Sequence, residues 1–400
     1  MILRAVIALM VLLPICSGAK SLYVSTTGSD ATTYANNDID NPWASPQEAW
    51  YNAAAGDTVF FRAGTYTITT QINTKFNGNS GTAGSPIVFR SYPGEQATFA
   101  SYAITGTVFL IEKDYNHVYD IDFTGNAATW FHLGYDVTGE HFEVSYCNVS
   151  LGTGGDNTGF VLTTPRSDYL VLEYCTIEGP GLQSEGYHGN TSCIFSSVMD
   201  YGTIRYNTLH NAPIGIYFKH ANDENSSNVI SNNYIYNCDR YSIETNSQYA
   251  EFSNNIIGAD CGAFRVNEAN GSPMGDNNTI SHNTIMSGGI LLSTDDTGAD
   301  NNTITNNIIS SYTNCCDGNT WDYNLYVSGS AIGANDIANQ SPTFTTTPQV
   351  DPADFVLDAA SYGYGGGSDG EDVGADAANV GSGSTPTITA PTNLTATKVE

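Results

Sequence analysis

The sequence predicts an all-β protein, a single-stranded right-handed parallel β-helix (a solenoid) with a short N-terminal capping helix. The main observation is a phrase, Ile204-Arg-Tyr-Asn207-Thr-Leu209, that returns with its Asn at residues 233, 255, 283 and 307. Two earlier copies carry Cys147 and Cys175 in place of the Asn, and the steps between copies vary from 22 to 32 residues. Each copy is too short to bury a core alone, so successive copies must stack as coils.

The repeated Asn side chains are expected to be structural. Strands of successive coils lie about 4.8 Å apart, so equal positions of successive copies stack on one another. The sequence therefore predicts one inward column of side chains that share amide hydrogen bonds, formed by Asn207, Asn233, Asn255, Asn283 and Asn307. Cys147 and Cys175 fall in the same column and either stack as thiols or form a disulfide.

The chain opens with the pattern of a secretory signal peptide over residues 1–19, where Arg4 precedes an apolar run and Ser17-Gly-Ala19 offers a cleavage site. The β-helix domain is expected over residues 20–378. Near its start, Ser45 and Pro46 have the cap and first-turn chemistry of a helix, and Glu48 stands three residues beyond the cap. This helix would plug the first coil, whose core and strand edges would otherwise be exposed.

The charge balance limits the partners. The chain has 41 acidic residues against 12 Lys and Arg, a formal net charge of −29, so little is available to meet the phosphates of a nucleic acid. After residue 19, no apolar run is long enough for a membrane span. The acidity is compatible with Ca²⁺ as a cofactor, although solvated acidic loops are the simpler explanation of Asp223, Glu224, Asp295, Asp296 and Asp300.

Both ends of the expected domain resemble a known group of proteins. The segments that carry the likeness are Leu22-Tyr-Val-Ser, Pro42-Trp-Ala-Ser-Pro-Gln-Glu-Ala, Gly56-Asp-Thr-Val-Phe-Phe-Arg-Ala-Gly64, Asp354-Phe-Val-Leu357 and Asp372-Val-Gly-Ala-Asp376. They are similar to segments of secreted β-helix proteins in the pectate-lyase-like superfamily, which includes chondroitin- and alginate-lyase-like polysaccharide lyases. The resemblance implies the fold over about residues 22–378, and an architecture that also hosts hydrolases and non-catalytic adhesins.

The second strand of each coil brings scarce cations together. When these strands are laid in register, six side chains of three consecutive coils fall on one solvent-facing patch, here called the cation patch: Tyr217, Lys219, Glu244, Asn246, Arg265 and Asn267. Glu268 directly follows the patch. His188 lies on an inserted loop that is able to overhang it.

The cation patch predicts β-elimination on a uronic-acid polysaccharide, because that reaction needs a base beside a neutralised carboxylate. Lys219 would be the base, and it falls where the lyase group that the chain resembles keeps a catalytic Lys. Arg265, with Asn246 or Asn267, would hold the carboxylate, and Tyr217 would protonate the leaving oxygen or stack on a sugar. The resembled group places its partner Arg one coil after the Lys, where this chain has Asn246.

Three alternatives stay open from sequence alone. Lys219, Glu244 and Arg265 could form a surface ion-pair row without a chemical role. A glycoside hydrolase would use two carboxylates, Glu244 and Glu268, with Asp295 or Asp296 as substitutes. A non-catalytic protein that binds or adheres to glycans would use the β-helix only as a rigid rod.

Beyond the β-helix, residues 379–390 have the Gly, Ser and Thr content of a flexible linker. Residues 391–400 resemble the first strand of a fibronectin type III module. Taken together, the sequence predicts a secreted, monomeric, extracellular protein whose partner is an acidic polysaccharide.

Overall fold

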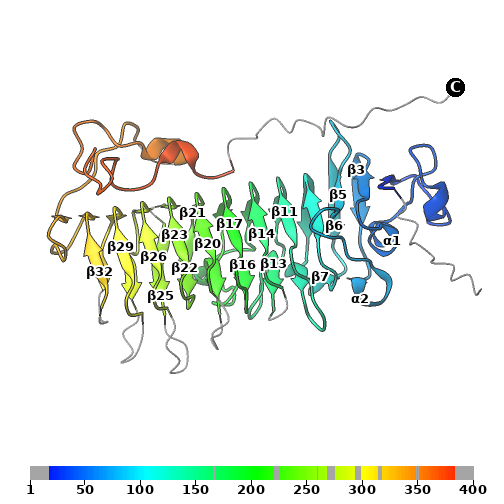
Figure 1. Cartoon of the computed structure of the whole chain (residues 1–400), viewed down its shortest axis with the longest axis horizontal. Helices are drawn as coiled ribbons and strands as arrows, with labels where there is room; N and C mark the ends of the chain where they lie inside the picture. Colours follow the sequence, from blue (N-terminus) through cyan, green and yellow to red (C-terminus); the bar gives the residue numbers. More distant parts are fainter. Residues whose placement is uncertain are drawn as a thin grey trace, which may run out of the picture.

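The predicted solenoid is confirmed. A computed structural model describes residues 18–382, apart from 165–166, 220–225, 259, 268–274, 293–298, 314–317, 348 and 350. Its described strands form three parallel sheets that run along one long axis (Figure 1). Each coil contributes one strand in turn to sheet A, sheet B and sheet C, so that neighbours in a sheet come from consecutive coils.

The strands are short because each one is a single side of a coil. Sheet A contains β1 (Ser21–Val24), β2 (Thr58–Phe61), β5 (Ile87–Ser91), β8 (Asn116–Tyr119), β11 (Glu143–Ser145), β14 (Val171–Glu173), β17 (Thr203–Arg205), β20 (Val229–Ser231), β23 (Glu251–Ser253), β26 (Thr279–Ser281), β29 (Thr303–Thr305) and β32 (Thr320–Asp322).

Sheet B contains β3 (Gly64–Thr67), β6 (Ala97–Ser101), β9 (Ile121–Gly125), β12 (Asn148–Ser150), β15 (Thr176–Glu178), β18 (Thr208–His210), β21 (Tyr234–Tyr236), β24 (Ile256–Ile257), β27 (Thr284–Ile285), β30 (Ile308–Ile309), β33 (Leu325–Tyr326) and β34 (Ile337–Ala338). Sheet C contains β4 (Ile72–Asn73), β7 (Thr107–Ile111), β10 (Thr129–Leu133), β13 (Val161–Thr163), β16 (Ser192–Ser196), β19 (Ile214–Phe218), β22 (Cys238–Thr245), β25 (Cys261–Val266), β28 (Ile290–Leu292) and β31 (Tyr312–Thr313).

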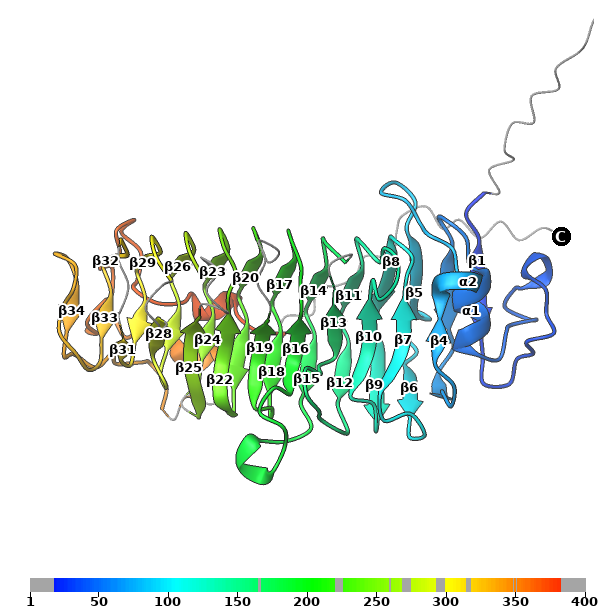
Figure 2. The ribbon, with the colours of Figure 1, turned by 90° about the horizontal axis from the view of Figure 1, so that it is seen from below.

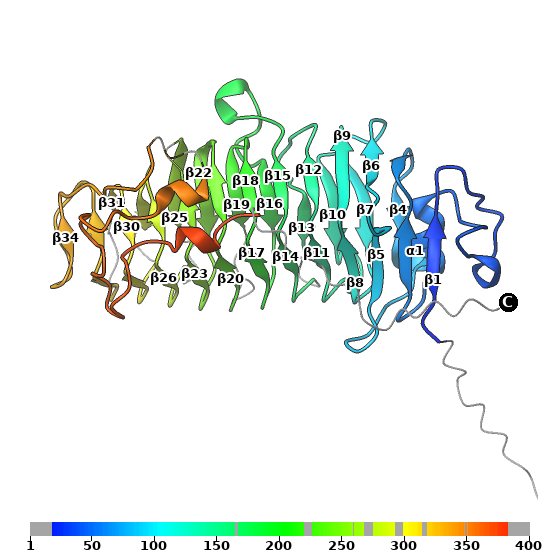
Figure 3. The ribbon, with the colours of Figure 1, turned by 90° about the horizontal axis from the view of Figure 1, so that it is seen from above.

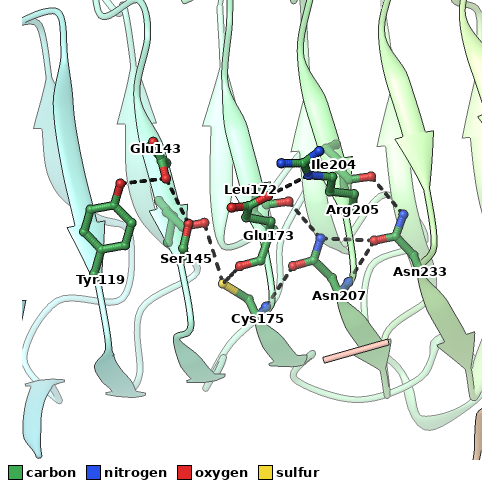
Figure 4. A network of polar contacts seen from close by, with 11 residues as sticks. Tyr119, Glu143, Ser145, Leu172, Glu173, Cys175, Ile204, Arg205, Asn207 and Asn233 are labelled. Carbon is green, nitrogen blue, oxygen red and sulfur yellow. Dashed lines mark hydrogen bonds and ion pairs between the residues drawn. The ribbon is translucent and has the colours of Figure 1, made fainter. Parts of the chain in front are cut away.

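The Asn ladder lies at the turn between sheets A and B, buried as predicted (Figure 4). In each step, the backbone N–H and the side-chain amide of one Asn donate to Oδ1 of the next; for Asn207 and Asn233 these distances are 3.1 and 3.0 Å. The same pattern continues to Asn324, one coil beyond the predicted column. The repeated phrase is therefore a device that satisfies buried backbone donors at a tight turn.

Cys147 and Cys175 are free, buried thiols, which resolves the alternative left open by the sequence. The backbone N–H of Cys175 donates to Oδ1 of Asn207, so the Cys pair continues the column upstream of the Asn side chains.

The first coil is plugged as expected. Helix α1 (Pro46–Asn52) has Ser45 as its N-cap, whose side chain accepts a hydrogen bond from the backbone N–H of Glu48. Trp50 of this helix is buried, and its ring stacks on that of Phe89 with centroids 3.8 Å apart. A second short helix, α2 (Thr74–Asn77), lies beside the first coils (Figure 2). No helix in the described part of the chain has the length and apolar character that crossing a membrane requires.

After β34 the chain turns back and runs along the outside of sheet B as a covering segment, residues 339–382 (Figure 3). This segment contains the 3₁₀ turns Pro352–Phe355 and Ala377–Asn379. Its apolar side chains, among them Phe355, Leu357 and Val373, form a second core with outward residues of sheet B.

The predicted linker starts inside this segment. Val380 is buried, and Ser382 forms a 3.0 Å side-chain hydrogen bond with Thr208. Residues 383–390 of the linker, the fibronectin-like residues 391–400, and residues 1–17 of the signal peptide lie outside the described residues, so these three predictions stay predictions.

Candidate functional site on sheet C

The strand register of sheet C confirms the outward column inferred from the sequence. Tyr217 pairs with Glu244, and Glu244 pairs with Arg265, on the consecutive strands β19, β22 and β25. The intervening residues point into the core, as shown by the complete burial of Ile216 and Ile243. Lys219, Asn246 and Asn267 follow directly after these three strands, so that all six residues of the cation patch lie on consecutive coils.

The prediction that the whole patch faces solvent is wrong. Tyr217, Glu244 and Asn246 are only 8%, 5% and 3% exposed. The physical reason is lateral packing on the outside of the sheet: the ring of Phe195 packs edge-on against Tyr217 with centroids 5.4 Å apart, and Tyr241 adjoins the same small cluster. The reactive groups therefore lie in a recess whose rim is formed by Lys219, Arg265 and Asn267.

Arg265 closes one side of this recess. Its Nη1 lies 3.1 Å from Oε1 of Glu244 and donates to the hydroxyl of Tyr241 at 3.2 Å, while Nη2 donates to Oδ1 of Asn267 at 3.1 Å. The guanidinium group also lies 5.3 Å from the centre of the Tyr241 ring. Three partners thus fix the guanidinium plane, and the ion pair with Glu244 is largely buried rather than a surface row.

Glu244 retains one unused oxygen. Its Oε2 is buried and has no hydrogen-bond partner among the residues that the structure describes. Burial raises the pKa of the Glu244 carboxyl above its ordinary value, and the charges of Arg265, Arg240 and Lys219 counter part of that shift. Burial likewise raises the pKa of Tyr217 well above its ordinary value, so its hydroxyl stays protonated over the whole neutral range.

Lys219 is held by a residue that the sequence did not single out. Its Nζ donates a 2.7 Å hydrogen bond to Oδ1 of Asn157, on the loop before β13. The neighbouring Asp156 bonds to Asn190 at 2.7 Å and lies 3.8 Å from Nδ1 of His188. His188 is thus connected to the rim of the recess through Asp156, as its predicted position on an overhanging loop requires.

A third cation, Arg240, was missed. It lies in the first half of β22, and its Nη1 donates to the backbone carbonyl of Gly189 and, at 2.8 Å, to Oδ1 of Asn190. Its neighbour Asp239 accepts two backbone hydrogen bonds from the same loop, from Gln183 and Ser184. These contacts fasten the inserted loop, visible between β15 and β16 in Figures 2 and 3, to the edge of the recess.

A register shift explains why Arg240 escaped sequence reasoning. β22 pairs irregularly with β25 between Cys238 and Ile243, so strict alternation does not predict the direction of residue 240. The available signal was the run Asp239-Arg240-Tyr241 just before the outward Glu244, which places a charged pair at the start of the strand.

The recess encloses a hollow of about 40 Å³ lined by Tyr217, Phe218, Lys219, Glu244, Thr245, Asn246 and Asn267. Lys219 lines the hollow, and the charges of Arg265 and Arg240 also act on the carboxyl of Glu244. Of these three cations, Arg265 alone forms an ion pair with a described carboxylate. Neither Lys219 nor Arg240 lies within 4 Å of a described carboxylate oxygen. Lys219 and Arg240 therefore form no salt bridge with a described carboxylate, although the charges of both act on the nearby carboxyl of Glu244. Glu268, the remaining predicted residue, lies outside the described part.

The described residues around the hollow do not fit a Ca²⁺ ion. Calcium takes six to eight oxygen ligands, usually with several carboxylates. Here one oxygen of Glu244 already holds Arg265, and no group of three or more His, Cys, Asp and Glu side chains gathers anywhere in the described chain. Of the acidic loop residues, 223, 224, 295 and 296 lie outside the described part and Asp300 lies within it, so Ca²⁺ binding by this set stays the untested alternative to a solvated acidic loop.

The three sheets define the class of the fold as a right-handed parallel β-helix. Residues 22–176 match the family described as the Pel9A-like, right handed beta helix region. Pectate lyase PEL9 of Emericella nidulans is 42% identical over 89 residues, which cover 22% of this chain and 20% of that protein. The chain thus matches about a fifth of the length of this relative.

Two solved structures are similar in fold. Pectate lyase Pel9A has a TM-score of 0.57 at 13% identity, covering 90% of this chain and 96% of its own. A mannuronic acid specific family 6 lyase from the human gut microbiota has a TM-score of 0.50 at 15% identity, covering 78% and 68%. The family match ends at residue 176, before Lys219, so it does not extend to the recess.

Proposed function

We propose that this protein is a secreted polysaccharide lyase that cleaves a uronic-acid polysaccharide by β-elimination in the recess of sheet C. The observation that carries the proposal is the grouping of Lys219, which can serve as the base, with two arginines, Arg265 and Arg240, around Glu244 in a chain of net charge −29. Such a site attracts and neutralises a substrate carboxylate locally while the rest of the surface is acidic.

The reaction needs a base that removes the proton from the ring carbon beside the carboxylate group. Lys219, as the neutral amine, takes this proton. The electron pair of the broken C–H bond forms a carbon–carbon double bond and expels the glycosidic oxygen. Arg265 and Arg240 bind the carboxylate, whose negative charge grows as the proton leaves. The protonated phenol of Tyr217 supplies the proton that the leaving oxygen takes up, and Asn246 and Asn267 donate hydrogen bonds to the sugar. His188 would contact the polysaccharide from the inserted loop, and Glu268 would extend the surface that binds it.

Glu244 has a different role in this scheme. It orients Arg265 through the 3.1 Å ion pair and does not touch the substrate proton. Its unpaired Oε2 and raised pKa are also properties of a general acid, and they favour a second candidate function, glycoside hydrolysis with Glu268 as the partner carboxylate.

The test is to incubate the protein with pectate, alginate, chondroitin and a heparin-like polysaccharide, and to follow the ultraviolet absorbance of the unsaturated product. We expect absorbance to rise with one of these, with and without chelator, and to be lost in Lys219→Ala but retained in Lys113→Ala, a control outside the recess. New reducing ends without absorbance would replace the lyase with the hydrolase. Retention on a glycan column without any cleavage would leave a binding protein.

Secretion is part of the proposal, because polysaccharides of this class lie outside cells. The signal pattern of residues 1–19 supports it. N-terminal sequencing of protein recovered from the culture medium should begin at Lys20. Recovery of the chain only inside cells, with its N-terminus intact, would contradict it.

A further inference from the structure

A second feature of the surface points to a separate glycan contact. At the turn from sheet C to sheet A, one residue per coil adopts a left-handed conformation, and four consecutive coils place aromatic rings there: Tyr115, His141, Tyr169 and Tyr201. The rings stack face to face, with centroids 4.3, 4.4 and 5.2 Å apart and planes within 10°. The column is thus a continuous aromatic stack along the edge of the solenoid.

The stack is interrupted by one missing ring. The backbone N–H of Tyr201 donates to Ser226 and that of Ser227 to Gln248, so Tyr201, Ser227 and Tyr249 occupy equal positions on three consecutive coils. All three share the left-handed conformation, with φ of 57°, 58° and 53°. The hydroxymethyl group of Ser227 therefore stands where the neighbouring coils carry rings.

The gap has the width of one inserted ring. Two coil steps of about 4.8 Å separate Tyr201 from Tyr249, about 9.6 Å in all. Stacked rings lie about 4.5 Å or more apart, so one ring between two others needs about 9 Å. Tyr201 and Tyr249 are 53% and 63% exposed, and within the described chain no ring stacks on Tyr249 or on the second face of Tyr201.

The negative charge beside the gap favours an uncharged sugar ring over a uronate. Asp200 directly precedes Tyr201, and Asp276 supplies the carbonyl that accepts from the N–H of Tyr249. Both side chains are carboxylates, and no Lys or Arg immediately adjoins Tyr201, Ser227 or Tyr249 in the chain. A uronate carboxylate would be repelled here, whereas an uncharged sugar presents the C–H groups of its ring face to an aromatic ring.

We propose that the slot formed by Tyr201, Ser227 and Tyr249 binds an uncharged pyranose ring of a glycan, sandwiched between the two tyrosines. This goes beyond the elimination reaction. It gives the protein a second glycan contact, because Ser227 and Tyr249 lie at the turns that directly follow the strands of Lys219 and Glu244.

The experiment is affinity electrophoresis in gels that contain a neutral polysaccharide, galactan or glucomannan, or an acidic one, pectate or alginate. We expect a neutral polysaccharide to retard the parent, and Tyr201→Ala and Tyr249→Ala each to bind it about three- to tenfold more weakly. Ser227→Tyr fills the slot with the ring that neighbouring coils carry, and should abolish the retardation while the thermal midpoint stays at or above that of the parent. Tyr102→Ala, another exposed tyrosine, is the matched control.

Lys219→Ala separates the two proposals, because it removes elimination and should leave retardation by the neutral glycan unchanged. Retardation that is equal in the parent and the slot variants would overturn the slot, and so would retardation by acidic polysaccharides alone. Neither result would affect the cleavage assay. If the parent protein cleaves no polysaccharide but still shows slot-dependent retardation, the proposed lyase activity is wrong and the proposed slot stands.

Discussion

The base of the proposed reaction depends on one neighbour for its orientation. Among described residues, Asn157 alone bonds to the amine of Lys219, at 2.7 Å. A hydrogen bond to a charged group is worth about 1.5–3 kcal/mol. Asn157→Gly removes this bond and keeps the left-handed backbone, φ 58°, without strain. If that energy orients Lys219 in the transition state, kcat should fall about 10- to 150-fold.

Asn157→Asp separates orientation from charge. It keeps the shape of the side chain but places a carboxylate beside the amine, which favours the protonated amine that cannot act as a base. The pH–rate profile should move to higher pH, with activity recovered under alkaline conditions, whereas Asn157→Gly should lose activity at every pH.

Initial rates of product absorbance across pH, with Asn148→Gly on sheet B as the control, would measure both effects. An Asn157→Gly variant within twofold of the parent, together with an unshifted profile for Asn157→Asp, would refute the assignment of Lys219 as the base.

Three further predictions concern stability. Asn255→Ala leaves two buried donors of Asn233 unpaired and should cost about 2–6 kcal/mol in urea unfolding, against less than about 1 kcal/mol for the exposed Asn148→Ala; equal costs would contradict the ladder. Burial lowers the pKa of His132 to about 4 from 6.5, so the folded state binds this proton less readily than the unfolded state. Above about pH 6.5 the imidazole is neutral in both states, and the free energy of unfolding is unaffected. As the pH drops to about 4, the unfolded state takes up the proton first, and the free energy of unfolding falls by about 3 kcal/mol. His132→Leu should remove that part of the acid sensitivity, and an unchanged slope of unfolding free energy against pH would show otherwise. Trp50→Ala should cost about 3–5 kcal/mol by opening the plugged end, measured by thermal unfolding, and a loss below about 1 kcal/mol would contradict the plug.

The fold was predictable because a parallel solenoid repeats one local rule. Once the position of Asn207 recurs in later coils, stacking fixes the register, and alternation then fixes which side chains of β19, β22 and β25 point outward. The same reasoning placed Tyr217, Glu244 and Arg265 in one column without any knowledge of the loops.

What could not be predicted depends on contacts between coils that are irregular. The burial of Glu244 comes from side chains of neighbouring coils, and the approach of Asn157 comes from a loop without a repeat. Arg240 escaped because β22 shifts register. A second ladder, through Asn278, Asn302 and Asn319, was hidden because Ala250 interrupts it one coil earlier.

The aromatic turns were also missed. Tyrosine rarely adopts the left-handed conformation, so a pattern of Tyr146, Tyr174 and Tyr206 suggests strands rather than turns. In the structure all three have positive φ, and their rings stack with centroids 4.8 Å apart. Stacking between coils offsets a backbone cost that would disfavour each turn alone.

The central claim is elimination by Lys219, and the mass of the products tests it most directly. The protein should be incubated with the polysaccharide that gives absorbance, and its oligosaccharides analysed by mass spectrometry. Elimination adds no water, so the account predicts that each new non-reducing end is lighter by one water than a hydrolytic product, and that Lys219→Ala forms none. Products that carry the added water, or an active Lys219→Ala variant, would contradict it.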